Sequence, residues 1–466
     1  MTKISRWKKV LTTFAVMLLA FTPFTASAAA PTVSAIDTGD TTWIIVAVAL
    51  VLFMHVPGLA LFYGGLVSER NVVSTLMHSF ISLIIVTIVW VLWGYTLSYG
   101  TSIGGFIGGL DYLLFNGVDG EAYSGLTIPH YLFATLQIVY VAITVAIISG
   151  GISGRISFKA WIPFTVLWPT FVYAPMAHAV WGGGWLAQMG ELDFAGGTVV
   201  HITSGVAALV AALVIGPRTK KTLNHKPHNI VFFLFGAATL WFGWFGFNGG
   251  SALASGALTS LAIANTHVAG AAGGLGWLII EWKLRKRPTL VGTATGVIAG
   301  LVAITPGAGF VAIPSALLIG LIGAPVCYLS INFIKARFKY DDTLDAFGVH
   351  GMAGIWGAIA TGLFATTSVN EAGNNGLFYG NPEQLLHQLM GVGASVIITV
   401  IGTYVILKFI GLFTPLRVSE EEEITGLDLS LHAEPAYHSN DEEDPEITND
   451  KSVFGSGAAG SHVYMK

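Results

Sequence analysis

The stretch LDFAGGTVVHITSGVAALVAALVIG, residues 192–216, decides the fold, and LDAFGVHGMAGIWGAIATGLF, residues 344–364, echoes it. Both begin with Leu-Asp, pass through glycine, and place a histidine, His201 or His350, inside a long apolar run. An ionisable group at membrane depth is costly and usually faces a pathway or a packed interior. A duplicated one predicts a conduit through a bilayer that is built from two related halves.

The composition of the chain supports a membrane setting. Of its 466 residues, 53% are hydrophobic and only 10% are charged, whereas an ordinary soluble domain is about 25% charged. The mean hydropathy is +0.70, and the 57 glycines suit close contacts between membrane helices. The single cysteine, Cys327, excludes an internal disulfide, a multi-cysteine metal site and a redox pair.

Residues 1–28 predict a signal peptide, with a basic start, an apolar run over residues 10–21 and a small-residue cleavage site at residues 26–28. The alternative is an uncleaved first membrane helix. Pro23 and the shortness of the apolar run favour cleavage.

Eleven further segments are apolar, and nearly all are long enough to cross a bilayer as helices. Several contain glycine, which membrane helices tolerate where neighbouring helices satisfy the backbone. The sequence therefore predicts an all-α polytopic membrane protein with eleven transmembrane helices in a domain covering residues 41–415. The expected spans are 42–66, 72–97, 128–150, 158–180, 196–215, 229–250, 257–281, 289–304, 312–334, 346–366 and 386–412.

The basic residues occur in every second connection between these spans. Lys and Arg lie in or beside the first, third, fifth, seventh and ninth connections, and the intervening ones contain none. By the positive-inside rule, the mature N-terminus is outside and the C-terminus is inside, which fits an odd number of spans.

Ten of the eleven spans divide into five plus five. Because five is odd, the second half must be an inverted repeat of the first. Phe62-Tyr63-Gly64-Gly65 at the end of the first span and Phe247-Asn248-Gly249-Gly250 at the end of the sixth support this division. Residues 416–466 are polar and acidic, and we expect a partly disordered cytosolic tail that is too polar to bury a core of its own.

His201 and His350 allow three interpretations. Each could be a core histidine bonded to a neighbouring helix, which is the usual case for a lone one. Two histidines at equivalent places in inverted halves would instead meet near the middle of the membrane and line a pathway. Imidazole suits a pathway because it donates and accepts hydrogen bonds and exchanges a proton near neutral pH. A metal site is disfavoured because no third ligand lies nearby in the sequence, and we expect no metal and no cofactor.

A second group of candidate residues lies at the predicted outer boundary. Trp181 precedes three glycines, and the run GWFGFNGGS at 243–251 follows one helix later. An aromatic belt at the lipid headgroups explains most tryptophans in such a chain. An indole beside flexible backbone also suits a small cation, which the ring attracts by roughly 0.5–2 kcal/mol. This run contributes Trp244, Phe247, Asn248 and Ser251, whose hydroxyl can accept a hydrogen bond from the cation.

Asp193 and Asp345 each precede a glycine-containing helix start, where a carboxylate can cap free amide donors. We expect this structural role for Asp345, on the predicted inner side. For Asp193, on the outer side, structural support and attraction of cations are both open. The basic connections are explained by topology, so we expect no nucleic-acid partner.

These residues belong to long motifs, in a fixed order, that closely resemble the ammonium transporter (Amt/Mep/Rh) family in its bacterial or archaeal Amt form. The resemblance extends from about residue 41 to residue 437. The motifs are PGLALFYGGLV at 57–67, AHAVWGGG at 177–184, LDFAGGTVVHI at 192–202, KPHN at 226–229, GWFGFNGGS at 243–251, DAFGVHG at 345–351 and GLDLSLHAEPAY at 426–437.

The resemblance implies a role for each candidate residue. Trp181 and Ser251 would form an outer ammonium-recruitment site, and Phe247 would be one of two stacked aromatic gates. His201 and His350 would be twin pore histidines. Structural or cation-attracting roles are implied for Asp193, Trp244, Asn248 and Thr305.

The outer gate departs from the family pattern. Tyr140 stands where phenylalanine is common, and Leu136 stands one turn earlier, where a second aromatic residue is often found. Tyrosine still offers a cation-attracting face, and its hydroxyl changes the polarity of the gate. We expect Tyr140 to join the substrate site and Leu136 to line the gate.

The resemblance implies an ammonium transporter in the plasma membrane, and not an enzyme. We expect ammonium to lose its proton at the outer site, because an ion at Phe247 would face a large desolvation penalty. Ammonia, with or without a separately routed proton, would then pass the histidines. Passive conduction of ammonia and an ammonium sensor are the alternatives. The resemblance also implies a homotrimer and a PII-type signal protein at the cytosolic mouth.

Overall fold

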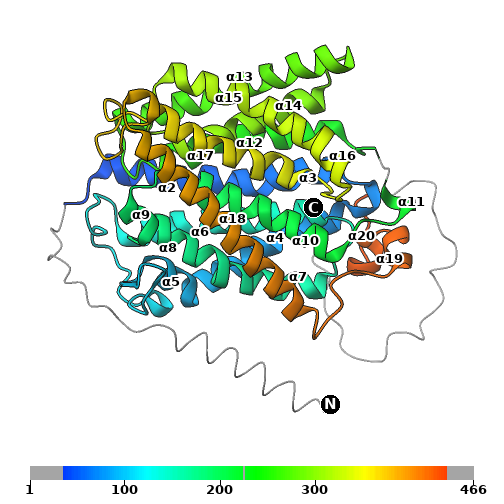
Figure 1. Ribbon diagram of the computed structural model, residues 1–466. Coiled ribbons are helices and arrows are strands. Elements are labelled where there is room, and N and C mark those ends of the chain that lie inside the picture. Colours follow the sequence, from blue (N-terminus) through cyan, green and yellow to red (C-terminus); the bar gives the residue numbers. More distant parts are fainter. Residues whose placement is uncertain (1–34, 224–225, 438–466) are drawn as a thin grey trace, which may run out of the picture.

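Long helices that lie side by side dominate the computed structural model, which describes residues 35–223 and 226–437 (Figure 1). The predicted signal peptide and the tail after residue 437 lie outside these residues. Within them, 10 helical segments are long and apolar enough to cross a membrane, and each lies within a few residues of a predicted span. They are Thr38–Leu66, Glu69–Tyr99, His130–Ile152, Gly197–Ile215, Ile230–Gly250, Ala257–Arg285, Leu290–Gly307, Ile313–Phe338, Phe347–Phe364 and Pro382–Ile410.

Many of these segments combine α-helix with a short 3₁₀- or π-helical stretch, which is labelled η. The elements of the first half are α2 (Thr38–Phe53), η1 (Met54–Leu59), α3 (Ala60–Leu66), η2 (Glu69–Asn71), α4 (Val72–Val89), η3 (Trp90–Gly94), α5 (Tyr95–Tyr99), β1 (Ser102–Ile103), β2 (Ile107–Gly108), η4 (Leu113–Phe115), α6 (His130–Ile152), α7 (Phe158–Trp168), η5 (Pro169–Tyr173), α8 (Ala174–Val180), α9 (Trp185–Met189), η6 (Gly197–Ile202) and α10 (Thr203–Ile215). The short strands β1 and β2 pair antiparallel.

The second half repeats this pattern of long helices. Its elements are α11 (Lys220–Leu223), α12 (Ile230–Gly250), α13 (Ala257–Arg285), α14 (Leu290–Ile304), η7 (Thr305–Gly307), α15 (Ile313–Leu329), η8 (Ser330–Ile334), α16 (Lys335–Phe338), η9 (Phe347–Gly351), α17 (Met352–Phe364), η10 (Leu377–Tyr379), α18 (Pro382–Ile410), α19 (Glu420–Thr425) and α20 (Leu427–His432).

The segment 158–180, which the sequence predicts as the fourth span, is helical without a break through α7, η5 and α8. It is not among the ten apolar helices. Three prolines, Pro163, Pro169 and Pro175, and several aromatic side chains dilute its aliphatic content. The eleven-helix count therefore stays a prediction.

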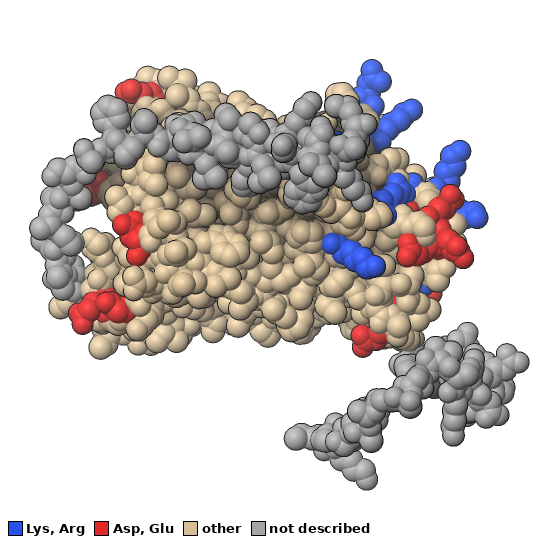
Figure 2. Space-filling model, turned by 90° about the horizontal axis from the view of Figure 1, so that it is seen from below, with Lys and Arg blue, Asp and Glu red and all other residues tan. Residues whose placement is uncertain are grey.

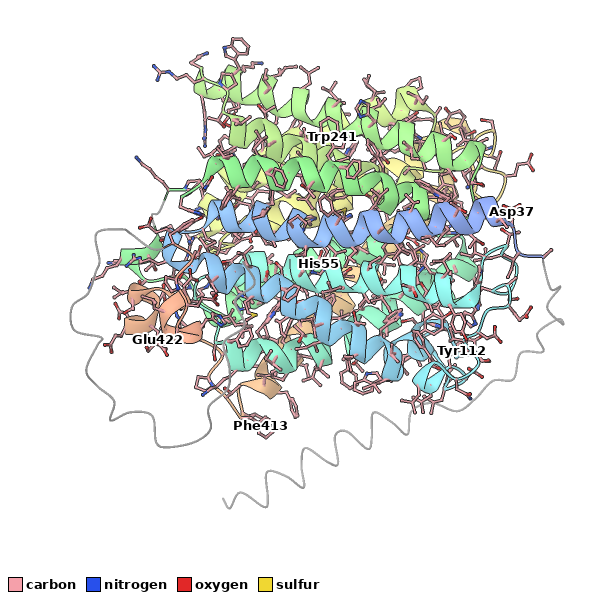
Figure 3. All side chains as sticks on the ribbon, turned by 180° about the vertical axis from the view of Figure 1, so that it is seen from behind. Asp37, His55, Tyr112, Trp241, Phe413 and Glu422 are labelled. Atoms are coloured by element: carbon pink, nitrogen blue, oxygen red, sulfur yellow. The ribbon has the colours of Figure 1, made fainter. Side chains whose placement is uncertain are left out.

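The charged residues separate the molecule into two ends. On the face that Figure 2 draws, Lys and Arg side chains gather at one end, which we call the basic end, together with some Asp and Glu. The charged side chains visible at the other end, which we call the acidic end, are Asp and Glu. In Figure 3, Asp37 and Tyr112 mark the acidic end, and Glu422 and Phe413 mark the basic end. The connections 100–129, 181–196, 251–256, 308–312 and 365–381 at the acidic end contain no Lys or Arg.

The two histidine-bearing helices run in opposite directions and cross at close range. The helix η6–α10 starts at the acidic end and η9–α17 starts at the basic end; η6 contacts α17, and η9 contacts α10. At the crossing, a Cβ on Gly205 would lie 2.2 Å from the backbone nitrogen of Gly351. Only glycine allows this approach, which brings the two histidines together.

The described part of the tail docks on the basic end. The Ser74 N–H at the start of α4 donates to the Asp428 carboxylate (2.8 Å), and Arg417 pairs with the buried Glu423 (2.6 Å). A second carboxylate, Asp341, accepts two hydrogen bonds from the Arg218 guanidinium (2.8 and 2.9 Å). The tail is held to the rest of the molecule by the Ser74–Asp428 bond and by the Thr219 N–H, which donates to Glu423 Oε1 (2.7 Å).

Candidate functional site

Asp193 holds the start of the first histidine-bearing helix. Its carboxylate accepts four backbone N–H donors, from Gly196, Gly197, Thr198 and Val199, at 2.6–3.0 Å. These are the donors that a helix start leaves without a partner, and a carboxylate also complements the helix dipole. Asp193 therefore fixes η6, the π-helical turn that carries His201.

In the second half, Asp342 has the corresponding position. Its carboxylate accepts the N–H groups of Ala346, Phe347 and Gly348 at 2.8–3.3 Å and so caps η9, the π-helical turn that carries His350. The expectation that Asp345 caps this helix is wrong. The carboxylate of Asp345 pairs instead with the Lys335 ammonium at 2.6 Å.

The two histidines meet as a stacked pair in the interior. The Nδ1 atoms of His201 and His350 lie 3.2 Å apart, and the ring centroids are 5.3 Å apart at an angle of 22°. His201 is fully buried and His350 is 4% exposed. The His201 Nε2 atom has no hydrogen-bond partner among the described residues. Because one Nδ1 must donate and the other accept, the pair shares a single proton across this bond.

Tyr140, Phe247 and Ser251 form a constriction on the acidic side of the histidines. The ring of Phe247 lies 4.6 Å from that of Tyr140 and 5.9 Å from that of His201. The Tyr140 hydroxyl donates to the Phe247 carbonyl (2.8 Å) and lies 3.0 Å from Ser251 Oγ. Tyr140 and Phe247 are both buried, so an ion would lose its water here, at a large cost in free energy. Leu136 is buried one turn nearer the acidic end on α6.

Trp181 lies above this constriction and is partly exposed. Its ring centroid is 6.5 Å from that of Tyr140, and its indole N–H donates to the backbone carbonyl of Asp193 (2.8 Å). The residue that caps the histidine helix thus also orients the outer indole. A cation held between Trp181, Tyr140 and Ser251 would meet two aromatic faces and one hydroxyl acceptor.

Trp244 lies beside His201 and contacts Thr305, and Asn248 joins two neighbouring helices. The Trp244 ring stacks on His201 with centroids 5.4 Å apart, and its indole N–H donates to the Thr305 hydroxyl (3.0 Å). Thr305 is fully buried behind Trp244. The Asn248 amide donates to the Thr266 hydroxyl (2.9 Å) and joins α12 to α13.

A cavity opens on the far side of the histidines, toward the basic end. His350, Phe62, Tyr63, Thr295 and Asp345 are among its lining residues. The Tyr63 hydroxyl donates to the carbonyl of Ile147 (3.1 Å). The sequence analysis uses Phe62 and Tyr63 only as evidence for the repeat and assigns them no place in a site. The pattern that could have indicated one is an aromatic pair followed by two glycines.

The fold and these residues define a multi-pass membrane protein with a stacked pair of histidines buried between its two ends. The chain belongs to the Ammonium Transporter Family, whose model matches residues 42–437. It is a transporter and not an enzyme.

Curated relatives match over nearly their whole length. The ammonium transporter of Bacillus subtilis is 52% identical over 403 residues, which cover 86% of this chain and 98% of the relative. The ammonium transporter Amt1 of Archaeoglobus fulgidus is 46% identical over 400 residues, covering 86% and 99%.

Solved structures share the fold. Mep2 of Saccharomyces cerevisiae is 34% identical with a TM-score of 0.77, and the match covers 86% of this chain and 94% of that one. A structure described as a Sensor Amt Protein is 30% identical with a TM-score of 0.77, covering 84% and 98%.

Proposed function

We propose that the chain recruits ammonium at Trp181, Tyr140 and Ser251, removes its proton, and conducts ammonia past His201 and His350. The observation that carries this proposal is one unbroken line of ring contacts, from Trp181 through Tyr140 and Phe247 to the two histidines. Potassium can occupy a cation-attracting site but has no proton to lose, so deprotonation supplies selectivity.

The acidic end is proposed to face outside and the basic end the cytosol of a cell bounded by the plasma membrane, with eleven helices between them. An end without Lys or Arg concentrates cations before they reach Trp181. The proton of ammonium either returns outside or follows its own route through the histidine pair.

A homotrimer is part of the same proposal. His267, on the membrane-spanning helix α13, is exposed and stacks on Trp241 with ring centroids 5.4 Å apart. An imidazole facing lipid is costly, so a neighbouring subunit is the better cover for this face. The basic end, with its docked tail, is where a PII-type signal protein would bind.

Current on a solid-supported membrane that carries the purified protein tests the proposal. An ammonium jump should give a current that potassium does not, and Trp181→Leu should weaken it. A pH change driven by ammonia without any current would favour passive conduction of the neutral gas. Silence in both measurements would favour a sensor.

A further inference from the structure

Glu191 is a buried carboxyl group that the proposed pathway does not use. It stands two residues before Asp193, and the residue is 5% exposed. The Thr198 hydroxyl donates to Glu191 Oε1 at 2.7 Å, while Glu191 Oε2 has no hydrogen-bond partner among the described residues. The amide donors at the start of η6 are all taken by Asp193.

Helix α18 covers this carboxyl group closely. A Cβ on Gly391 would lie 2.8 Å from Glu191 Cγ and 2.9 Å from its Oε1, so the two surfaces are in direct contact. Gln388 clamps Leu192 by accepting its N–H (2.7 Å) and donating to its carbonyl (2.8 Å). Gln384 donates to the carbonyl of Gly190 (2.8 Å). These side chains are neutral and exclude water without supplying a positive charge.

The titratable groups that face Glu191 do not supply a fixed cation either. Asp193 lies on the same segment, Tyr173 of η5 lies near Asp193, and α18 contributes His387 and Glu383, which contact each other at 3.7 Å. A buried carboxylate without a cation partner, beside a second carboxylate, takes up a proton. Burial, and then the charge of Asp193, raise the pKa of Glu191 to about 8. Burial raises the pKa of Asp193 as well, but its four amide donors oppose this rise by stabilising the charged form, and Glu191 has no such donors.

We infer that Glu191 is a positioning residue of the transport pathway that works as a neutral carboxylic acid. Its proton keeps a single negative charge at the start of η6, and its Oε1 holds Thr198, which stands one turn before His201. Loss of the proton would place a second buried negative charge beside Asp193 and loosen residues 190–198. This role rests on the proposed function, whereas the protonation of Glu191 does not.

Infrared spectroscopy of the full-length protein in lipid measures this proton directly. The carbonyl band of a protonated carboxyl group should be present at about pH 7 and fall to about a tenth by one pH unit above its midpoint. The band should be missing from Glu191→Gln and unchanged in the matched control Glu371→Gln, an exposed carboxyl at the same end. A difference spectrum without this band, or a midpoint near the ordinary value of a glutamate, would overturn the inference.

Transport of methylammonium supplies the second readout, because methylamine is a stronger base than ammonia and therefore stays protonated to higher pH. The wild-type current should fall as pH rises from about 7 to about 9, while Glu191→Gln, which keeps an acceptor for Thr198, should stay flat over this range. Identical pH profiles would count against the positioning role. If neither protein gives a current or a pH change driven by ammonia, the proposed function is overturned, and the infrared band still decides whether Glu191 holds its proton.

Discussion

Asp193 and Asp342 stand the same eight residues before His201 and His350, and each caps the π-helical turn that holds its histidine. The two halves of the chain therefore position their histidines by the same device. Four amide donors at Asp193 and three at Asp342 fix the two helix starts from opposite ends of the molecule.

Asp342→Asn should release the start of η9 and move His350. An asparagine keeps the shape but not the charge that complements the helix start, so we expect a loss of about 1–2 kcal/mol in unfolding free energy and reduced ammonium current. Asp345→Asn, which removes only a partly exposed ion pair with Lys335, should cost less than about 1 kcal/mol. Thermal unfolding of both variants in the same detergent compares them, and equal losses would refute the assignment of the cap.

His201→Asp should reduce selectivity for ammonium over potassium. A carboxylate in place of the imidazole can accept from His350 but puts a negative charge in the centre of the pathway, which stabilises any cation there. We expect a current after a potassium jump that the wild type does not give. The comparison variant His350→Ala removes the pair without adding charge and should lower ammonium flux. Wild-type flux and selectivity in both variants would exclude a role for the pair.

Trp181→Leu should weaken recruitment of ammonium. Loss of the cation–indole attraction, roughly 0.5–2 kcal/mol, corresponds to an increase of about 2- to 30-fold in the ammonium concentration at half-maximal current. Trp185→Leu is the matched control, because Trp185 begins α9 at the same end and contacts Phe106 away from the histidine line. A similar change in both variants would mean that the effect is structural.

Acid should loosen the basic end before the rest of the molecule. Burial alone would raise the pKa of Asp341, but hydrogen bonds from Arg218 and the charge of Arg155 lower it to about 2. A lowered pKa stabilises the folded state above the ordinary aspartate pKa, and this stabilisation is lost as pH falls from about 4 to about 2. Limited proteolysis over this range should cut near residues 217–223 first. In Asp341→Asn the same cuts should already occur at neutral pH; protection of that variant would contradict this account.

The spans were predictable because length and hydropathy are local properties of a sequence. The ten apolar helices need no knowledge of their neighbours, and the same holds for the separation of Lys and Arg from the acidic end. The segment 158–180 shows the limit, since it is helical but its prolines and aromatic residues make it less clearly apolar.

The site was predictable as a list of residues but not as a geometry. His201 and His350 lie together because Gly205 lets their helices cross, which no local motif encodes. The Leu-Asp pairs predict that Asp345 corresponds to Asp193. In the structure, Asp342 and not Asp345 accepts the N–H groups at the start of η9. Glu191 was missed for the same reason, because α18, two hundred residues later, is what buries it.

The hydrogen bond between His201 and His350 has only one proton to share. Whichever ring donates, the other accepts, so one neutral ring carries its hydrogen on Nδ1 and the other on Nε2. Two halves that resemble each other in their helices differ at this point. Exchanging these roles moves the shared proton from one Nδ1 to the other. Both rings stay neutral only if the new donor also loses a proton from its Nε2 and the new acceptor gains one there. The dipole between the rings then reverses while every helix stays in place. A pair of like residues, each held by a carboxylate cap at its own helix start, thereby acquires a direction.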